Sequence, residues 1–160
     1  MGPYRVPNAR IDTVAVYTNN VYAGAFRGFG GPQVTFAVER QMDILAEELG
    51  IDPVELRLKN ILKVGDRTVH GQLLTESHGV GLEEALRKVV KAADWYRKRR
   101  ELRKQKDTIR RGIGIALSWH GNSIGAEGAD YSAVAIIINS DGSVIFRTGL
   151  MDMGQGSVWG

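Results

Sequence analysis

The chain has 160 residues, of which 43% are apolar and 24% are charged, and its formal net charge is +3. This composition permits a sizeable core and argues against a mainly disordered chain, while the small net charge does not by itself indicate a nucleic-acid partner. The absence of cysteine excludes disulfides and thiolate metal sites on this chain, and no apolar run approaches the ~18 residues of a membrane span, so we expect a cytoplasmic protein without membrane contact.

The first third of the chain predicts a strand, a glycine-rich loop and a helix. Residues 11–18 have strand composition with partial alternation. The glycine-rich loop 24–31 leads to Pro32, a residue that suits the first position of a helix. Apolar residues then recur at helical spacing until Gly50, which predicts a left-handed stop. The members of this stripe are Val34, Val38, Met42, Leu45 and Leu49.

Two further helices are predicted in the middle of the chain. Asp52 and Pro53 suit the cap and first position of a short helix that runs to about Asn60. One face of this helix carries Val54, Leu58 and Ile61. Residues 62–80 are polar and rich in turn formers, which predicts an extended loop. Helical spacing restarts with Leu82, Leu86, Val89 and Ala93.

The last third predicts strands. Residues 113–119 and 133–138 are short apolar runs typical of strands buried on both faces. The turn formers at 139–142 predict a hairpin in which 143–147 pairs back onto the second run. Strands at both ends with helices between them predict the α+β class.

Residues 97–111 form a strongly basic stretch with nine Lys or Arg and two acids. A nucleic-acid site would need a basic groove with aromatic side chains, and Trp95 and Tyr96 adjoin the run. A solvated helix end followed by a linker explains the stretch more simply, so we expect no nucleic-acid binding. The alternative function is a non-catalytic assembly module that uses the basic helix 97–111 on an anionic partner.

Three common kinds of site are excluded by their spacing. The Rossmann pattern Gly-x-Gly-x-x-Gly fails in the glycine loop because Gln33 stands where the third glycine is required. His120, Glu127 and Asp130 match no usual metal-ligand spacing, so no metal held by side chains is predicted. No Gly-x-Ser-x-Gly elbow and no cysteine nucleophile is present, which leaves nucleophilic hydrolysis unsupported.

Two glycine-framed segments are candidate ligand loops. In the first, Phe26, Arg27, Gly28 and Phe29 place two aromatics and an arginine on flexible backbone, as a ligand loop requires. The second segment is 153–156, where the amide of a glutamine can donate and accept between glycines. Its residues are Met153, Gly154, Gln155 and Gly156.

The motifs of this chain resemble, in order, those of the molybdenum hydroxylase family, which includes xanthine dehydrogenases, aldehyde oxidoreductases and nicotinate dehydrogenases. The resemblance covers essentially the whole chain. The matching segments are residues 2–8, 17–20, 24–33, 39–43, 52–60 and 152–156.

The resemblance implies that residues 1–160 are part of the molybdopterin-binding domain of a larger catalytic subunit, with a mixed sheet and packed helices. It implies cofactor contacts at Phe26, Arg27 and Gly28 and in the segment Met153–Gly156, including Gln155. It further implies that Phe29 faces the substrate. The implied cofactor is molybdopterin with molybdenum, in its plain form or as the cytosine dinucleotide.

The same resemblance implies oxidative hydroxylation of an N-heterocycle or an aldehyde, with water as the oxygen source. The implied partners are the remainder of the molybdenum subunit and the iron–sulfur and flavin subunits or domains. The family's catalytic base is a glutamate in a Gly-Val-Gly-Glu-like motif that this chain does not contain. We therefore expect no catalytic base on this chain and no turnover by the isolated chain.

Overall fold

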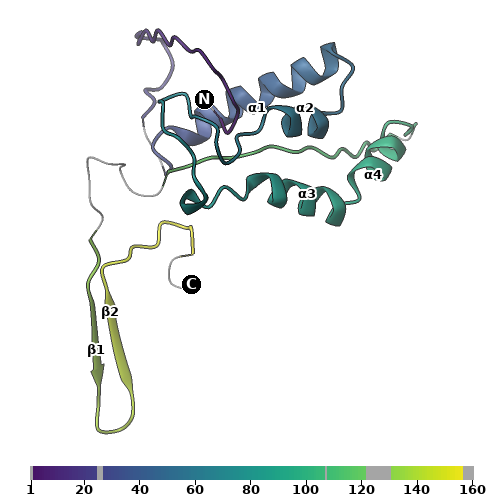
Figure 1. The fold of residues 1–160 in the computed structure, drawn as a ribbon. Coiled ribbons are helices and arrows are strands. Elements are labelled where there is room, and N and C mark those ends of the chain that lie inside the picture. The colour runs from purple at the N-terminus through teal and green to yellow at the C-terminus, as the bar shows by residue number, and fades with distance from the viewer. Residues whose placement is uncertain (1, 25–26, 107, 122–130, 157–160) are drawn as a thin grey trace. The chain divides into compact units, whose positions relative to one another are not determined.

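The computed structural model describes residues 2–24, 27–106, 108–121 and 131–156 (Figure 1). The chain divides into two compact units, Met1–Trp119 and His120–Gly160. The first unit contains helices and extended segments, and the second contains one antiparallel hairpin. This combination confirms the predicted α+β class.

The helices α1 (Gly31–Glu48) and α2 (Pro53–Asn60) confirm the predictions for the first half of the chain. A proline stands in the first turn of each helix, and Gly50 adopts the expected left-handed backbone with φ 63°. The Asp52 carboxylate accepts a hydrogen bond from the Val54 amide at 2.9 Å, which caps α2. Of the predicted α1 stripe only the centre, Val38 and Met42, packs against the core.

Residues 62–80 form the predicted loop, apart from the short 3₁₀ turn η1 (Glu76–His78). The helices α3 (Leu82–Ala92) and α4 (Trp95–Leu102) follow. The buried face of α3 is one position away from the predicted one, because Leu86 and Val90 are buried while Val89 is exposed. Leu82, Leu86 and Val90 lie four residues apart, which places them on one side of the helix.

Two strand predictions are wrong. Residues 11–18 form no strand and pair with none in the described part of the chain, and their apolar side chains are exposed. Residues 113–119 also join no sheet with any other described residue. β propensity alone does not make a strand, because a ladder needs a neighbouring strand to accept and donate its hydrogen bonds.

The segment 113–117 nevertheless packs as one face of a strand would. Ile113 and Ile115 are half-buried and Leu117 is buried, whereas the residues between them are exposed. The segment runs between the α1–α2 pair and α3 (Figure 1) and contributes its inward side chains to the core. The buried core residues are Tyr4, Val54, Ile61, Leu86, Val90, Trp95 and Leu117.

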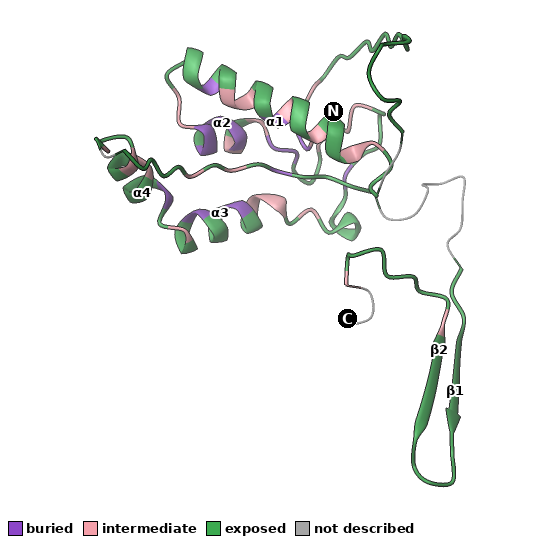
Figure 2. Ribbon diagram, turned by 180° about the vertical axis from the view of Figure 1, so that it is seen from behind, coloured by how far each residue is buried: buried purple, intermediate pink, exposed green. Residues whose placement is uncertain are grey.

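The hairpin of the second unit confirms the predicted pairing. Strands β1 (Val134–Ile138) and β2 (Val144–Thr148) are antiparallel, with Ile136 opposite Phe146. Gly142, at φ 84°, closes the turn by donating to the Asn139 carbonyl at 3.0 Å. The predicted burial on both faces is wrong for this chain, since both strands are exposed along almost their whole length (Figure 2). A lone two-stranded hairpin has no second layer to cover it.

Replacing Leu86 by alanine tests the core of the first unit. Leu86 is 2% exposed, so Leu86→Ala leaves a cavity and should lower the free energy of unfolding by about 2–5 kcal/mol. Leu49→Ala makes the same chemical change at a side chain that is 60% exposed and should cost no more than about 0.5 kcal/mol. Urea denaturation measures both values, and equal costs would contradict this core.

Candidate functional site

The loop that precedes α1 has an unusual backbone. Gly28, Phe29 and Gly30 all have positive φ, at 94°, 51° and 83°. For Phe29 this left-handed conformation costs about 1–2 kcal/mol, because its Cβ approaches the following carbonyl. Strain of this kind occurs where a loop is shaped for a ligand or a switch.

In the same loop, no side chain caps the start of α1, and only backbone groups form hydrogen bonds there. Gly30 is the N-cap residue and supplies no side-chain hydrogen bond, and the Gly31 amide donates to the Gly28 carbonyl at 2.8 Å. A Cβ at Gly28 would lie 2.8 Å from Cδ of Pro32, so only glycine fits there. Backbone amides in successive left-handed residues and at a helix start favour polar and anionic groups.

The predicted residues of this loop have different positions. Phe29 is 90% exposed, so its ring is available for contact. Arg27 and Gly28 belong to the same turn. Phe26 lies outside the described residues. The described part of this loop therefore combines an exposed aromatic ring at Phe29 with a backbone conformation that only glycine fits at position 28.

The second predicted loop, in the other unit, closes on itself through its side chains. Gln155 accepts a hydrogen bond from the Met153 amide at 2.6 Å and donates to the Met151 carbonyl at 2.8 Å. Asp152 accepts from the Gly154 amide at 2.6 Å. Gly154 and Gly156 have φ values of 105° and 87°, which side chains other than glycine rarely adopt. The Gln155 amide thus shapes this exposed loop.

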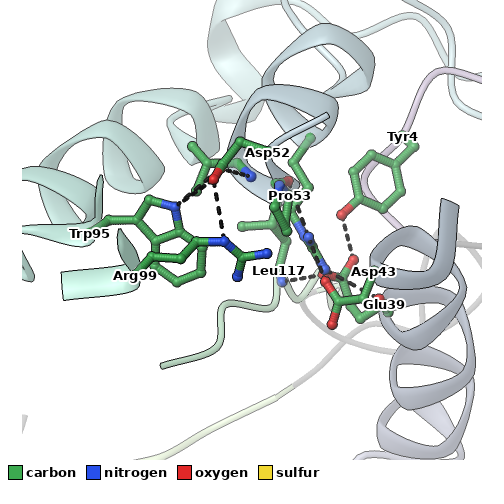
Figure 3. Close-up of polar contacts among 10 residues, drawn as sticks. Tyr4, Glu39, Asp43, Asp52, Pro53, Trp95, Arg99 and Leu117 are labelled. Carbon is green, nitrogen blue, oxygen red and sulfur yellow. Dashed lines mark hydrogen bonds and ion pairs between the residues drawn. The ribbon is translucent and has the colours of Figure 1, made fainter. Parts of the chain in front are cut away.

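A buried polar cluster joins α1 to three other segments (Figure 3). The Glu39 carboxylate on α1 accepts from the Arg57 Nε at 2.9 Å, the Tyr4 hydroxyl at 2.5 Å and the Leu117 amide at 2.8 Å. Arg57 on α2 also donates to Asp43 at 3.0 Å. Since Arg57 is fully buried and Glu39 is 5% exposed, each charge depends on these partners.

This environment shifts two pKa values. Burial by itself would lower the pKa of the Arg57 guanidinium, but the hydrogen bond and charge of Glu39 outweigh it and raise that pKa above its ordinary value. Burial and the hydrogen bond to Glu39 raise the pKa of the Tyr4 hydroxyl well above its usual range. Both groups therefore keep their protons at any physiological pH, which suits a structural cluster better than proton transfer.

A second cluster anchors α4 against the start of α2 (Figure 3). Besides capping α2, Asp52 accepts from the Trp95 indole nitrogen at 3.1 Å and pairs with Arg99 at 3.5 Å. The Arg99 guanidinium also lies 5.2 Å from the centre of the Trp95 ring. The sequence predicted the cap at Asp52 but gave no signal for its bonds to residues more than 40 positions away.

In the described ranges no group of three or more His, Cys, Asp or Glu could hold a metal ion. The residues Glu127 and Asp130 lie outside those ranges. None of the described helices is long and apolar enough to cross a membrane.

Comparison with protein families assigns both ends of the chain to one kind of domain. Residues 1–61 match a family model described as a molybdopterin cofactor-binding domain, and residues 86–159 match a second model with the same description. The chain belongs to the molybdopterin cofactor-binding family. Its cofactor-binding domain is of the type found in xanthine dehydrogenases and aldehyde oxidoreductases.

The relatives of this molybdopterin-binding chain are molybdenum enzymes. It is 38% identical over 142 residues to the putative xanthine dehydrogenase molybdenum-binding subunit of Escherichia coli, covering 88% of this chain. It is 37% identical over 154 residues to the aldehyde oxidoreductase of Megalodesulfovibrio gigas. It is 50% identical over 93 residues to the nicotinate dehydrogenase large molybdopterin subunit of Eubacterium barkeri. The chain spans only 16–21% of the length of these relatives.

Solved structures agree with the sequence relatives. The crystal structure of the aldehyde oxidoreductase from Desulfovibrio desulfuricans shares 37% sequence identity and a TM-score of 0.56 with this chain. The similarity covers 76% of this chain and 13% of that enzyme. The molybdopterin-binding chain thus has the local fold of one part of a much larger enzyme.

Removing the buried cation tests the cluster around Glu39. Arg57→Met leaves the Glu39 carboxylate buried without its counter-charge and should lower the free energy of unfolding by about 3–5 kcal/mol. Arg87→Met breaks an exposed ion pair with Glu83 and should cost at most about 1 kcal/mol. Chemical denaturation compares the two variants. A cost below about 1 kcal/mol for Arg57→Met would contradict the coupled role of this cluster.

Proposed function

We propose that this chain forms part of the molybdenum cofactor site of a larger hydroxylase subunit and that its two glycine-framed loops contact the cofactor. The observation that carries the proposal is the strained, exposed loop at Gly28–Gly30 in front of α1. A left-handed phenylalanine between two left-handed glycines has no role in the core of this unit. Its shape suits a bound group that takes up the exposed backbone and ring.

The two loops take different roles in this proposal. Phe26, Arg27 and Gly28 contact the pterin side of the cofactor, and Phe29 presents its ring to a planar substrate. Exposure of the Phe29 ring supports the substrate role, since an aromatic face stacks on planar, electron-poor rings.

The loop Met153–Gly156 supplies further cofactor contacts. Its glycines allow close approach of backbone, and Gln155 offers an amide that both donates and accepts. In the chain as it stands this amide bonds to its own loop, so contact with the cofactor exchanges or shares those two hydrogen bonds.

The reaction proposed for the complete enzyme is the oxidative hydroxylation of an N-heterocycle or an aldehyde with water as the source of oxygen. The bound molybdenum cofactor supplies the redox chemistry. This chain's own residues bind and orient, because no described side chain in either loop is a general base. The base is proposed to be a glutamate on another part of the subunit.

The proposed partners lie outside this chain, which spans about a fifth of the length of its relatives. They are the remainder of the molybdenum subunit and the iron–sulfur and flavin subunits or domains, in the cytoplasm. The family matches support cofactor binding as the function of the chain and give no support to a non-catalytic assembly module in its place.

Metal content of the complete enzyme tests the cofactor role. Gln155→Ala removes an amide whose loss leaves a buried cofactor group unsatisfied, at about 1–3 kcal/mol, and should weaken cofactor retention about 5- to 150-fold. Ser143→Ala, at the exposed hairpin turn of the same unit, is the control. Molybdenum and pterin per protomer are measured after extended dialysis. Undiminished occupancy in Gln155→Ala would make Gln155 a turn residue only.

Kinetics of the complete enzyme test the substrate role of Phe29. Phe29→Ala removes stacking that contributes about 0.5–1.5 kcal/mol, so KM should rise about 2- to 10-fold while molybdenum content stays normal. Phe29→Tyr keeps the ring and should retain the original KM. Loss of molybdenum in Phe29→Ala would place this residue against the cofactor instead of the substrate.

A further inference from the structure

The segment 112–116 is fixed at both ends but has an unpaired main chain between them. The Gln105 side-chain amide donates to the Arg111 carbonyl at 2.8 Å and accepts from the Arg111 amide at 3.1 Å. At the other end the Leu117 amide donates to the Glu39 carboxylate at 2.8 Å. Between these points no N–H or C=O group forms a hydrogen bond with any described residue. The main chain of the segment is therefore open to a further partner.

The course of this segment fixes the direction of its free main-chain groups. Ile113 and Ile115 are half-buried and the residues on either side of them are exposed, as on an extended strand, and the segment runs straight (Figure 1). In such a strand the N–H and C=O of one residue face the same side, and alternate residues face opposite sides. Because the Leu117 amide points to Glu39 on α1, the main-chain groups of Ile113 and Ile115 also face α1.

A hollow of about 520 Å³ is lined by residues 113–115, by the part of α1 that follows Glu39 and by α4. The charged side chains in its lining are three cations and three acids, so the hollow favours neither an anion nor a cation. They are Arg40, Arg99, Arg103, Asp43, Glu47 and Asp52. What the hollow offers a partner is two N–H and two C=O groups that alternate along one extended edge, which is the pattern that a second strand satisfies.

Nothing in the sequence of this segment protects the edge against pairing. Edge strands that face solvent in native proteins are protected by proline, by charged residues such as lysine, or by bulges. Residues 112–117 contain no proline and no charged residue. An edge of this composition is suited to receive a strand and poorly suited to remain in contact with solvent alone.

We propose that this hollow receives an extended, uncharged segment from the remainder of the subunit, which adds a strand along Ile113 and Ile115. Main-chain hydrogen bonds supply the affinity of such strand addition. The Glu39 carboxylate occupies the Leu117 amide and so ends the ladder. The remainder of the subunit is the source because this chain spans about a fifth of the length of its relatives. The inference rests on the proposed place of the chain in a larger subunit and not on its contacts with the cofactor.

Amide hydrogen exchange at single-residue resolution tests the strand addition. The amides of Ile113 and Ile115 should exchange at least about tenfold more slowly in the complete enzyme than in the isolated chain. The Leu117 amide is the internal reference, because its bond to Glu39 protects it in both samples. Unchanged exchange at Ile113 and Ile115 would overturn the proposal. Protection that develops in the isolated chain as its concentration rises would assign the edge to a second copy and would also overturn it.

A proline variant removes one donor of the proposed ladder. Ile113→Pro lacks the N–H, and the control Ile113→Ala loses the side chain but keeps the N–H. In the complete enzyme the half-life of heat inactivation should be about 2- to 10-fold shorter for Ile113→Pro than for Ile113→Ala, as expected for one lost hydrogen bond. Equal half-lives would contradict the ladder. Molybdenum content separates the two proposals, since normal molybdenum without protection of Ile113 and Ile115 counts only against the strand addition.

Discussion

The buried pair of Glu39 and Arg57 is the interaction on which the first unit depends. A single carboxylate on α1 accepts from the side chain of α2, from Tyr4 near the N-terminus and from the Leu117 amide. These four segments come from different parts of the sequence. Among the described residues, the Glu39 carboxylate is the group that contacts the other three directly. Because both charges are almost completely buried, the loss of either partner destabilises the unit strongly.

The Glu39–Arg57 pair also affects the loop in front of α1, which is the proposed cofactor loop. The strained residues 28–30 directly precede the helix, so anchoring the helix also fixes the base of the loop. A binding loop mounted on a rigid element loses less entropy when its ligand binds. The bonds of Asp52 do the same for α4, since they hold the basic helix against the start of α2.

Two segments of the chain expose many apolar side chains. The hairpin β1–β2 and residues 11–18 combine strand propensity with exposed apolar side chains, whereas the 113–117 segment buries one side. Exposed apolar surface of this extent indicates contact with further protein. The chain spans about a fifth of its relatives, which supports the remainder of the subunit as the source of that contact.

The sequence alone determined the features that depend on neighbouring residues. Helix α1 after Pro32, the stop at Gly50, the cap at Asp52 and the hairpin turn at Gly142 all follow from local backbone preferences. The glycine-framed loops were also visible, because left-handed backbone requires glycine. What the loops bind was suggested by family motifs, and the roles of Phe29 and Gln155 remain proposals.

Only the tertiary structure decided which charged residues are buried and which β-prone runs form a ladder. The apolar stripe predicted for α1 does not include Glu39, yet Glu39 is the centre of the polar cluster, because its partners come from Tyr4, Arg57 and Leu117. Residues 113–119 have strand composition but no neighbouring strand among the described residues. Burial and pairing depend on segments distant in sequence, and no local pattern encodes which of them meet.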